Sequence, residues 1–515
     1  MRRDLARGRD TSAFEGTHEY VFKHHLLHKV TYDSVLKRDK RERHRLTAEW
    51  LVARSGERVG EYHGLIGDHF EKAGDTANAI LYLRKAANDA SRAYAVEIAL
   101  GYFDRVLALM PESPERFDVL LRRLDAAFDR RVGEVHERNL VEMERLAEVL
   151  NDDSRRALAA SFRVTYLACL GDLAGTSAAA VKALAYAKTS GNAAAAMRAH
   201  NQWGHALSSA GEAAAAKEQL EQGLAVARSA GNRSGESAAL EHLGRMATGL
   251  GRYGEARGYL EAARNLAQHL GDHGWVNWLL CSLAENDLSI GHCMRANEQL
   301  LAVLKAFQTI GWPECEAHAA VCLARSAYAR AEFAEALAWL DQALEVDPGN
   351  EELEFQVSYN FWRADVHAAL GQVPQAISCY EQSAAACRKL NRPLAALEMQ
   401  AGLARLSLSN GDPLQANAHI GAVVAQFDAG WRPEGIVTDD LRVLLTCYEV
   451  LASSGDKRAA EFLAMANDKM RARTELLEPS EREAFLGNVA TNRSIVDAWV
   501  AEQPSQGGRP ESLES

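Results

Sequence analysis

Glycine recurs in this chain at an interval of 40 residues, and that interval limits what the chain can fold into. Six glycines follow the interval, and Ala331 takes the place of another. A second series of breaks lies halfway between them, so a turn falls about every 20 residues and leaves segments of about 16, which is helix length and too long for strands. Two helices per unit at a fixed period predict an all-α fold, an α-solenoid. The first series is Gly171, Gly211, Gly251, Gly291, Gly371 and Gly411, and the second is Gly191, Gly231, Gly271, Gly311 and Asn391.

Three packing columns recur in the same register. When each glycine of the first series is counted as position 15 of its unit, positions 8 and 20 are only Gly or Ala, as two closely crossing helices require. Position 24 is large in every unit, so it predicts the side chain that fills a gap between helices. The columns are Ala168, Gly204, Gly244, Ala284, Ala324, Ala364 and Ala404; Ala180, Ala216, Ala256, Ala296, Ala336, Ala376 and Ala416; and Leu184, Leu220, Leu260, Leu300, Leu340, Tyr380 and Ile420.

These columns resemble the tetratricopeptide repeat, which has small residues at positions 8 and 20 and a proline after its second helix, here Pro348. The period differs from that family, because most units here run 40 residues instead of 34. The resemblance implies helix pairs with longer helices.

A second resemblance covers residues 20–111. Phe22, Tyr32, His44, the run from Asp68 to Asp75, and the run from Leu107 to Pro111 look like the junction and first repeats that follow a STAND-type ATPase. The family is the bacterial signalling proteins that place a class III adenylate or guanylate cyclase, or another output domain, before the ATPase and a tetratricopeptide array after it. This chain has no G-x-x-x-x-G-K-[ST] loop, and the resemblance implies a sensor half without ATPase and cyclase domains. We expect a split gene, a truncated reading frame or a stand-alone sensor.

The pattern divides the chain into five parts. An amphipathic pattern from Tyr20 predicts two or three helices in the first part, broken near Tyr32 and at Ser55-Gly56. The run after Glu478-Pro479-Ser480 predicts one final helix, with Ser480 and Glu483 at capping-box spacing. The parts are a basic helical segment (1–58), irregular repeats (59–150), regular repeats (151–430), a C-terminal repeat with capping helices (431–502) and a disordered tail (503–515).

Charge and cysteine content narrow the classes of function. The net charge is −12, although residues 1–58 carry +5. An acidic solenoid is a poor partner for nucleic acid, which binds through an excess of positive charge. The eight cysteines form no C-x-x-C pair and are interpreted as reduced apolar fillers. With no continuous apolar run of membrane-spanning length and no signal peptide, we expect a cytoplasmic chain without membrane contact.

Our leading hypothesis is a non-catalytic interaction scaffold, the sensor arm of a bacterial signalling protein, binding a protein or peptide partner. Solenoids bind partners through the first helix of each unit, on the concave face. The mixed charges and aromatic side chains there suit such a groove. The candidate residues are Arg198, Asn201, His205, Glu241, Arg245, Trp278, Glu285, His318, Arg325, Tyr328, Phe361, Asp365, Glu398 and Arg405.

Two other classes of function stay open. A transcriptional regulator would use the basic N-terminal helices, although no recognition helix is identifiable. An enzyme would need paired groups, and adjacent residues such as Glu241 and His242 are expected to point apart on a helix. We identify no catalytic residue, no cofactor and no metal site. His24 and His28 share a helix face, but the sequence between them offers no carboxylate.

The charges at position 9 alternate in sign along five units, Arg245, Glu285, Arg325, Asp365 and Arg405, which we name the charge column. Equivalent first helices pack about 10 Å apart. We therefore predict that Glu285 lies between Arg245 and Arg325, and Asp365 between Arg325 and Arg405. We also predict at least sixteen helices, turns near the glycines, and no β-sheet.

Overall fold

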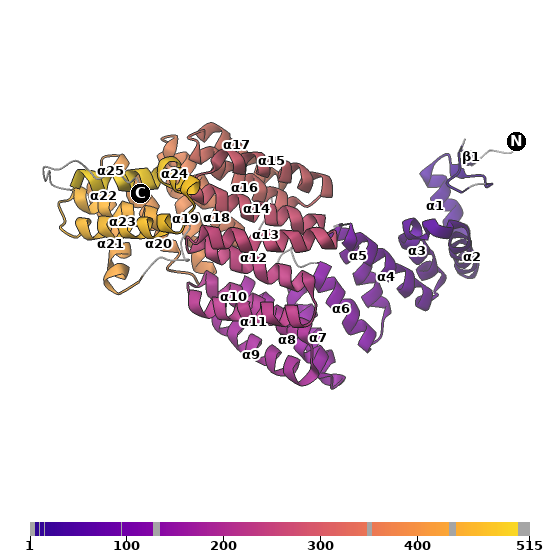
Figure 1. Ribbon diagram of the computed structural model, residues 1–515. Coiled ribbons are helices and arrows are strands. Elements are labelled where there is room, and N and C mark those ends of the chain that lie inside the picture. Colours follow the sequence, from indigo (N-terminus) through magenta and orange to yellow (C-terminus); the bar gives the residue numbers. More distant parts are fainter. Residues whose placement is uncertain are drawn as a thin grey trace. The chain divides into compact units, whose positions relative to one another are not determined.

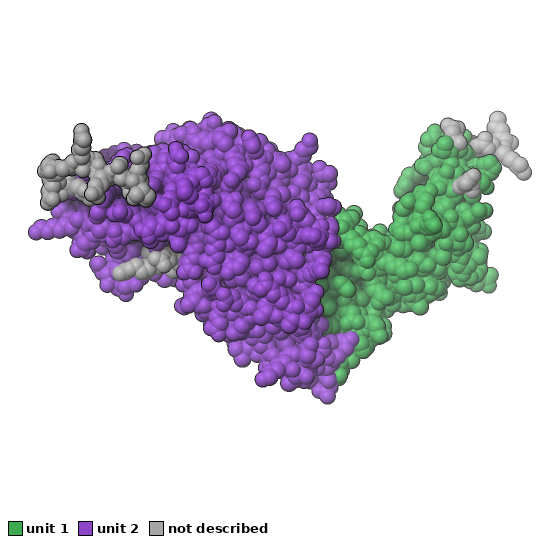
Figure 2. Space-filling model, viewed as in Figure 1, with its two compact units in different colours: residues 1–131, 141–150 green, residues 132–140, 151–515 purple. Residues whose placement is uncertain are grey.

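The computed structural model describes residues 6–9, 11–14, 16–93, 95–126, 134–347, 353–431 and 439–502. Pro348 and the predicted disordered tail, 503–515, lie outside these residues. The chain forms two compact units, residues 1–131 with 141–150, and residues 132–140 with 151–515 (Figure 2). The described residues form α-helices α1 to α25 (Figure 1), so the predictions of an all-α class and of at least sixteen helices are confirmed.

The first unit begins with a small sheet that the sequence analysis did not predict. Two three-residue strands, β1 and β2, pair antiparallel, with Ala6 opposite Phe22. The prediction of no β-sheet is therefore wrong at this point, because the extended Tyr20–Phe22 segment pairs its backbone with an earlier strand instead of starting a helix. The elements are β1 (Ala6–Gly8), β2 (Tyr20–Phe22), α1 (His25–Ser34), α2 (Lys37–Ser55), the 3-10 helix η1 (Gly56–Tyr62), α3 (His63–Ala73), α4 (Thr76–Arg92), α5 (Val96–Leu109) and α6 (Pro114–Ala126).

The predicted break near Tyr32 is displaced, because α1 continues through that residue to Ser34. The break at Ser55-Gly56 is confirmed, since α2 ends at Ser55. Helix α7 (Glu134–Val149) contributes residues to both units.

The second unit is a series of antiparallel helix pairs. In each pair a first helix packs against a second helix, and successive first helices from α8 to α22 also contact one another. The pairs are α8 (Asp153–Cys169) with α9 (Leu173–Ser190), α10 (Ala193–Ser209) with α11 (Ala213–Ser229), α12 (Arg233–Gly249) with α13 (Tyr253–Leu270), α14 (His273–Ile290) with α15 (Cys293–Ile310), α16 (Pro313–Ala329) with α17 (Phe333–Val346), α18 (Leu353–Ala369) with α19 (Val373–Lys389), α20 (Ala396–Ser409) with α21 (Pro413–Asp428), and α22 (Asp440–Ser453) with α23 (Ala459–Glu475).

The turns are as predicted. The break residue adopts a left-handed conformation that ends one helix, with φ of +71° at Gly171. After five of the breaks an Asp or Asn also caps the next helix, as when the Asp172 side chain accepts from the backbone N–H of Gly175; the five are Asp172, Asn192, Asn232, Asp272 and Asp412. The two non-glycine breaks, Ala331 and Asn391, also have positive φ, +61° and +54°.

The packing columns meet within each pair. A Cβ atom added at Gly204 or Gly244 would lie 2.6 Å from Cγ of Leu220 or Leu260, so position 24 fills the space that the small residue at position 8 leaves. All seven alanines at position 20 are fully buried. The α-solenoid of tetratricopeptide-like helix pairs is therefore confirmed. No helix of the described residues is long and apolar enough to cross a membrane.

The C-terminal helices return to the middle of the array. Two helices, α24 (Pro479–Asn488) and α25 (Ala490–Glu502), replace the single final helix predicted, and Glu478 stands at the N-cap in place of Ser480. Helix α24 packs against α14. The Asn488 side-chain amide donates to the Gly291 carbonyl at 3.1 Å, and the Phe485 and Tyr253 rings lie 5.7 Å apart.

Candidate functional site

Five successive first helices line one pocket of about 300 Å³ in the second unit. The first helices α10, α12, α14 and α16 contact one another in turn, and α18 adds the fifth wall. The position-9 residues of four units face this pocket, because that position recurs once per first helix: His205, Arg245, Glu285 and Arg325.

The pocket is rich in groups that donate hydrogen bonds. Arg245 and Arg325 supply guanidinium groups, and hydroxyls come from four of the five helices. The Arg325 guanidinium donates to Ser289 Oγ at 2.9 Å and lies 5.5 Å from the Trp362 ring centroid. Arginines held in this way suit a carboxylate or another anionic group. The hydroxyls are those of Ser208, Ser209, Thr248, Ser282 and Ser358.

Two histidines form one end of the pocket. The rings of His205 and His242 lie 5.1 Å apart, on α10 and α12. Burial, with the neighbouring His242, lowers the pKa of His205 well below its ordinary value of 6.5. His205 is therefore neutral at neutral pH and offers a nitrogen lone pair and an N–H to a ligand.

Glu241 lies beside His242 and is 1% exposed. It accepts from the Trp278 indole N–H at 3.1 Å, and His242 Nδ1 also lies 3.1 Å from it. Burial alone would raise the pKa of Glu241, but His242, Arg245 and the Trp278 hydrogen bond outweigh it and lower the pKa to about 2. The expectation that Glu241 and His242 point apart is wrong, because both side chains turn toward the same polar region.

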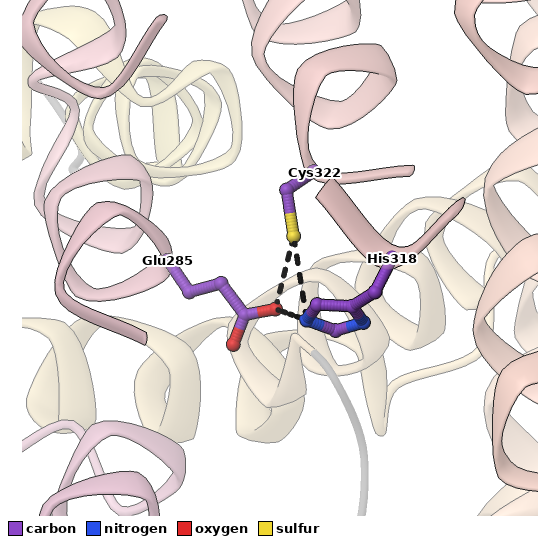
Figure 3. Close-up of side chains that lie close together, drawn as sticks. All are labelled: Glu285, His318 and Cys322. Atoms are coloured by element: carbon purple, nitrogen blue, oxygen red, sulfur yellow. Dashed lines mark hydrogen bonds and ion pairs between the residues drawn. The ribbon is translucent and has the colours of Figure 1, made fainter. Parts of the chain in front are cut away.

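Glu285, His318 and Cys322 converge at the pocket wall (Figure 3). Glu285 Oε1 lies 3.5 Å from His318 Nε2 and 3.3 Å from Cys322 Sγ, and the sulfur lies 3.7 Å from the same nitrogen. The Trp278 ring covers His318 at 5.0 Å between centroids. Although burial raises the pKa of Glu285, His318 and the positive field of Arg245 and Arg325 lower it below its usual range. We name these three residues the Glu-His-Cys cluster.

Asp365 occupies the same repeat position two units later, in a different environment. It is 1% exposed and accepts two hydrogen bonds from Arg442 of α22, one of them at 3.0 Å. Arg405 approaches it at 3.4 Å, and the Tyr380 hydroxyl donates to it. Tyr328 accepts from the same Arg442 at 3.2 Å. Asp365 is therefore enclosed by donors.

The charge column is correct for the contact of Asp365 with Arg405 and for the two arginines that act on Glu285, and it is wrong about the second arginine of Asp365. Asp365 contacts Arg405 as predicted, but its second arginine is Arg442, because Arg325 is held by Ser289 and lies over Trp362. Glu285 contacts His318 and Cys322, and the two arginines beside it act on it through their charge.

Four predicted residues belong neither to the pocket nor to the groups around Glu241, Glu285 and Asp365. Phe361 is 1% exposed and belongs to the apolar core between α18 and α19. Asn201 is buried against Gly223, and the Arg198 guanidinium lies 3.9 Å from the Phe162 ring centroid. Glu398 is buried and accepts from the backbone N–H of Asp439 at 2.9 Å. The pattern locates the first helices but does not tell which side of each helix faces a neighbour.

Sequence reasoning missed several residues of the site. Cys322 was interpreted as an apolar filler, although it follows His318 by four residues and so shares its helix face. None of the eight cysteines, all of which lie in the described residues, forms a disulfide, and Cys322 is the one in the Glu-His-Cys cluster. Arg442 gave no signal, because it lies after the last regular repeat.

No family model matches the chain, and no curated protein matches it. Solved structures with a similar fold include a Rap protein complexed with Competence and Sporulation Factor, at 12% identity, a TM-score of 0.42, and coverage of 82% of this chain and 99% of that chain. The Rap conjugation gene regulator of plasmid pLS20 with the Phr* peptide has 14% identity, a TM-score of 0.43, and coverage of 69% and 97%. A STAND protein with a tetratricopeptide repeat sensor from Pyrococcus horikoshii has 12% identity, a TM-score of 0.40, and coverage of 89% and 67%. Similarities this low identify neither the family nor the ligand of this chain.

Proposed function

We propose that the second unit is a binding scaffold that receives a peptide or protein partner, with an acidic group of the partner in the five-helix pocket. The observation that carries this proposal is the lining of the pocket, where Arg245, Arg325 and five hydroxyls come together on rigid helices. A carboxylate placed there receives charge-assisted hydrogen bonds that a neutral ligand cannot. Trp362 offers an apolar face for the adjoining part of the partner.

We further propose that this chain is a sensor in bacterial signal transduction. It would act in the cytoplasm on a STAND-type ATPase or a nucleotide cyclase module. The support for this part is the sequence resemblance of residues 20–111. The DNA upstream of Met1 tests it: an in-frame phosphate-loop ATPase supports a sensor split from its ATPase, and an unrelated gene favours a stand-alone adaptor instead.

Peptide binding tests the pocket. A fluorescein-labelled peptide library with free C-terminal carboxylates is screened by fluorescence anisotropy against the full chain, and hits are compared with their amidated forms. Arg325→Gln is expected to lower the affinity for such a peptide at least about tenfold, because a hydrogen bond to a charged group contributes roughly 1.5–3 kcal/mol.

Arg228→Gln is the matched control, since that side chain is 59% exposed on α11 and does not line the pocket. Equal loss in both arginine variants, or unchanged binding in Arg325→Gln, contradicts the assignment of the pocket.

A further inference from the structure

We propose that Glu285, His318 and Cys322 bind a zinc ion at the wall of the pocket. This inference goes beyond the proposed function, since it assigns a second class of ligand to different atoms. The three side chains offer a carboxylate oxygen, an imidazole nitrogen and a thiolate, which are the ligand types that Zn²⁺ takes in proteins.

The separations of the three ligand atoms match those around a tetrahedral ion. Bonds of about 2.3 Å to sulfur and about 2.0–2.1 Å to nitrogen and oxygen place tetrahedral ligand atoms about 3.3–3.6 Å apart. The observed separations are 3.3 Å for oxygen to sulfur, 3.5 Å for oxygen to nitrogen and 3.7 Å for nitrogen to sulfur. An ion therefore fits between the atoms with shifts of a few tenths of an ångström.

The ligands are held by helices. His318 and Cys322 lie four residues apart on α16, so both project from one face of that helix. Glu285 comes from α14, which packs directly against α16. The Trp278 ring lies against His318 and limits its orientation. Little ordering remains to be done when the ion binds, which favours affinity.

The open side of the cluster faces the pocket. Glu285 and Cys322 line the pocket, and the side chains of Glu285 and His318 are 25% and 26% exposed. An ion enters from this side, and a water molecule takes the fourth position, as in zinc sites with three protein ligands. Binding replaces the thiol proton of Cys322 with the Zn–S bond and releases that proton to solvent.

The positive charges beside the cluster lead to a prediction that holds only if the bound ligand is a cation. Arg245 and Arg325 act on Glu285 from α12 and α16. Ion binding with loss of the thiol proton adds one positive charge beside both arginines, so they oppose it. Arg245→Gln is therefore expected to tighten metal binding, whereas the proposed function requires the same variant to weaken binding of an anionic peptide. The two proposals can fail separately.

Cobalt titration of the full chain tests the site, because Co²⁺ replaces Zn²⁺ and absorbs visible light. We expect one equivalent to give the intense visible bands of a tetrahedral centre and a near-ultraviolet sulfur-to-cobalt band, both removed by added Zn²⁺. Cys322→Ser is expected to abolish the sulfur band. Glu285→Gln and His318→Gln are each expected to lower the affinity for Co²⁺ at least about 100-fold, because even the loss of a residue that only hydrogen-bonds to a metal ligand lowers metal affinity about 10–100-fold.

Two variants serve as controls. Cys281→Ser changes a neighbouring buried thiol on α14 and should retain the sulfur band. The double change His24→Ala, His28→Ala removes an exposed pair in the first unit that could bind Co²⁺ by itself, and it too should retain the band. Circular dichroism verifies that each variant keeps its helical content. A sulfur band that survives Cys322→Ser, or one lost in either control, overturns the proposal, as does a weak octahedral spectrum.

Discussion

Glu285 and Asp365 occupy the same repeat position on two first helices, yet their surroundings differ. Asp365 is 1% exposed and meets Arg442, Arg405 and Tyr380. Glu285 is 25% exposed, meets a histidine and a thiol, and opens on the pocket. One position in a repeat thus holds a structural carboxylate in one unit and a candidate ligand-binding carboxylate in another.

Helix α22, the first helix of the last pair, accounts for the difference. Arg442 of α22 reaches Asp365 and Tyr328, so the region around α18 is closed by side chains from outside the regular repeats. The pocket beside Glu285 is lined by residues of α10, α12, α14, α16 and α18. Position in the repeat determines which residues face inward, and the later helices determine which of them remain available.

Removal of the Asp365 carboxylate should lower the free energy of unfolding more than any of the other substitutions. Asp365→Asn removes the carboxylate that Arg442 and Arg405 share, and a buried pair broken in this way costs about 3–5 kcal/mol. Glu285→Gln should cost less than about 1 kcal/mol, since that carboxylate is partly solvated. Urea denaturation in the presence of a chelator measures the free energy of unfolding of both variants. Similar losses in the two variants would remove the distinction between the two carboxylates.

The packing that positions Tyr380 offers a smaller perturbation of the same region. A Cβ atom at Gly402 would lie 2.4 Å from the Tyr380 ring, whose hydroxyl donates to Asp365. Gly402→Ala should therefore destabilise the chain by about 1–3 kcal/mol. Gly421→Ala is the control, because nothing lies within 4 Å of a Cβ there, and it should be neutral or stabilising by up to about 1 kcal/mol. A Gly402→Ala variant as stable as the control would show that the ring is not held in place.

Acidification should also distinguish the two regions, and we expect it to change the free energy of unfolding least of the three perturbations. His205 at the pocket has a pKa lowered from 6.5 by burial, so below that value the unfolded chain binds a proton that the folded chain does not. Stability should fall by about 0.7 kcal/mol between about pH 7 and about pH 6 from this group alone. Asp365 has a lowered pKa despite its burial, because of Arg442 and Arg405, and its contribution is lost only as the pH falls below the ordinary value of 3.8.

Denaturation of the parent chain and of His205→Gln at several pH values tests this window. The variant should lose that part of the pH dependence and keep the acid limb below about pH 4. An unchanged slope near pH 6.5 in His205→Gln would mean that His205 binds a proton equally well in the folded and the unfolded chain, which contradicts the lowered pKa.

The repeat fold was predictable because its signals are local. A left-handed break at Gly171 or Ala331, a capping Asp172, and small residues such as Gly244 opposite Leu260 each depend on neighbours within one unit. The sequence pattern did not predict how each helix is rotated about its axis. Phe361 was therefore assigned to the concave face, although it belongs to the core.

The return of α24 to α14 could not be predicted from the repeat pattern either. Contacts between residues about 200 apart depend on small rotations that accumulate from unit to unit, and no single unit encodes their sum. For the same reason Arg442 was not connected with Asp365, and the enclosed cluster was interpreted as part of an open charge column. The Glu-His-Cys cluster was within reach, because His318 and Cys322 are one helical turn apart on one face.

The hydrogen bond between Asn488 and Gly291 has a consequence for how the second unit folds. Arrays whose units touch only their neighbours can form stepwise and lose their ends one unit at a time. Here one apolar cluster joins Tyr253 and Ile290 to residues of α20 to α25, so removal of the last helices exposes core in the middle of the array. Closure of so long a loop slows folding, because its entropy is lost before the contacts form. We therefore expect one cooperative unfolding transition for this unit, and we expect its folding during translation to finish only after α24 has left the ribosome.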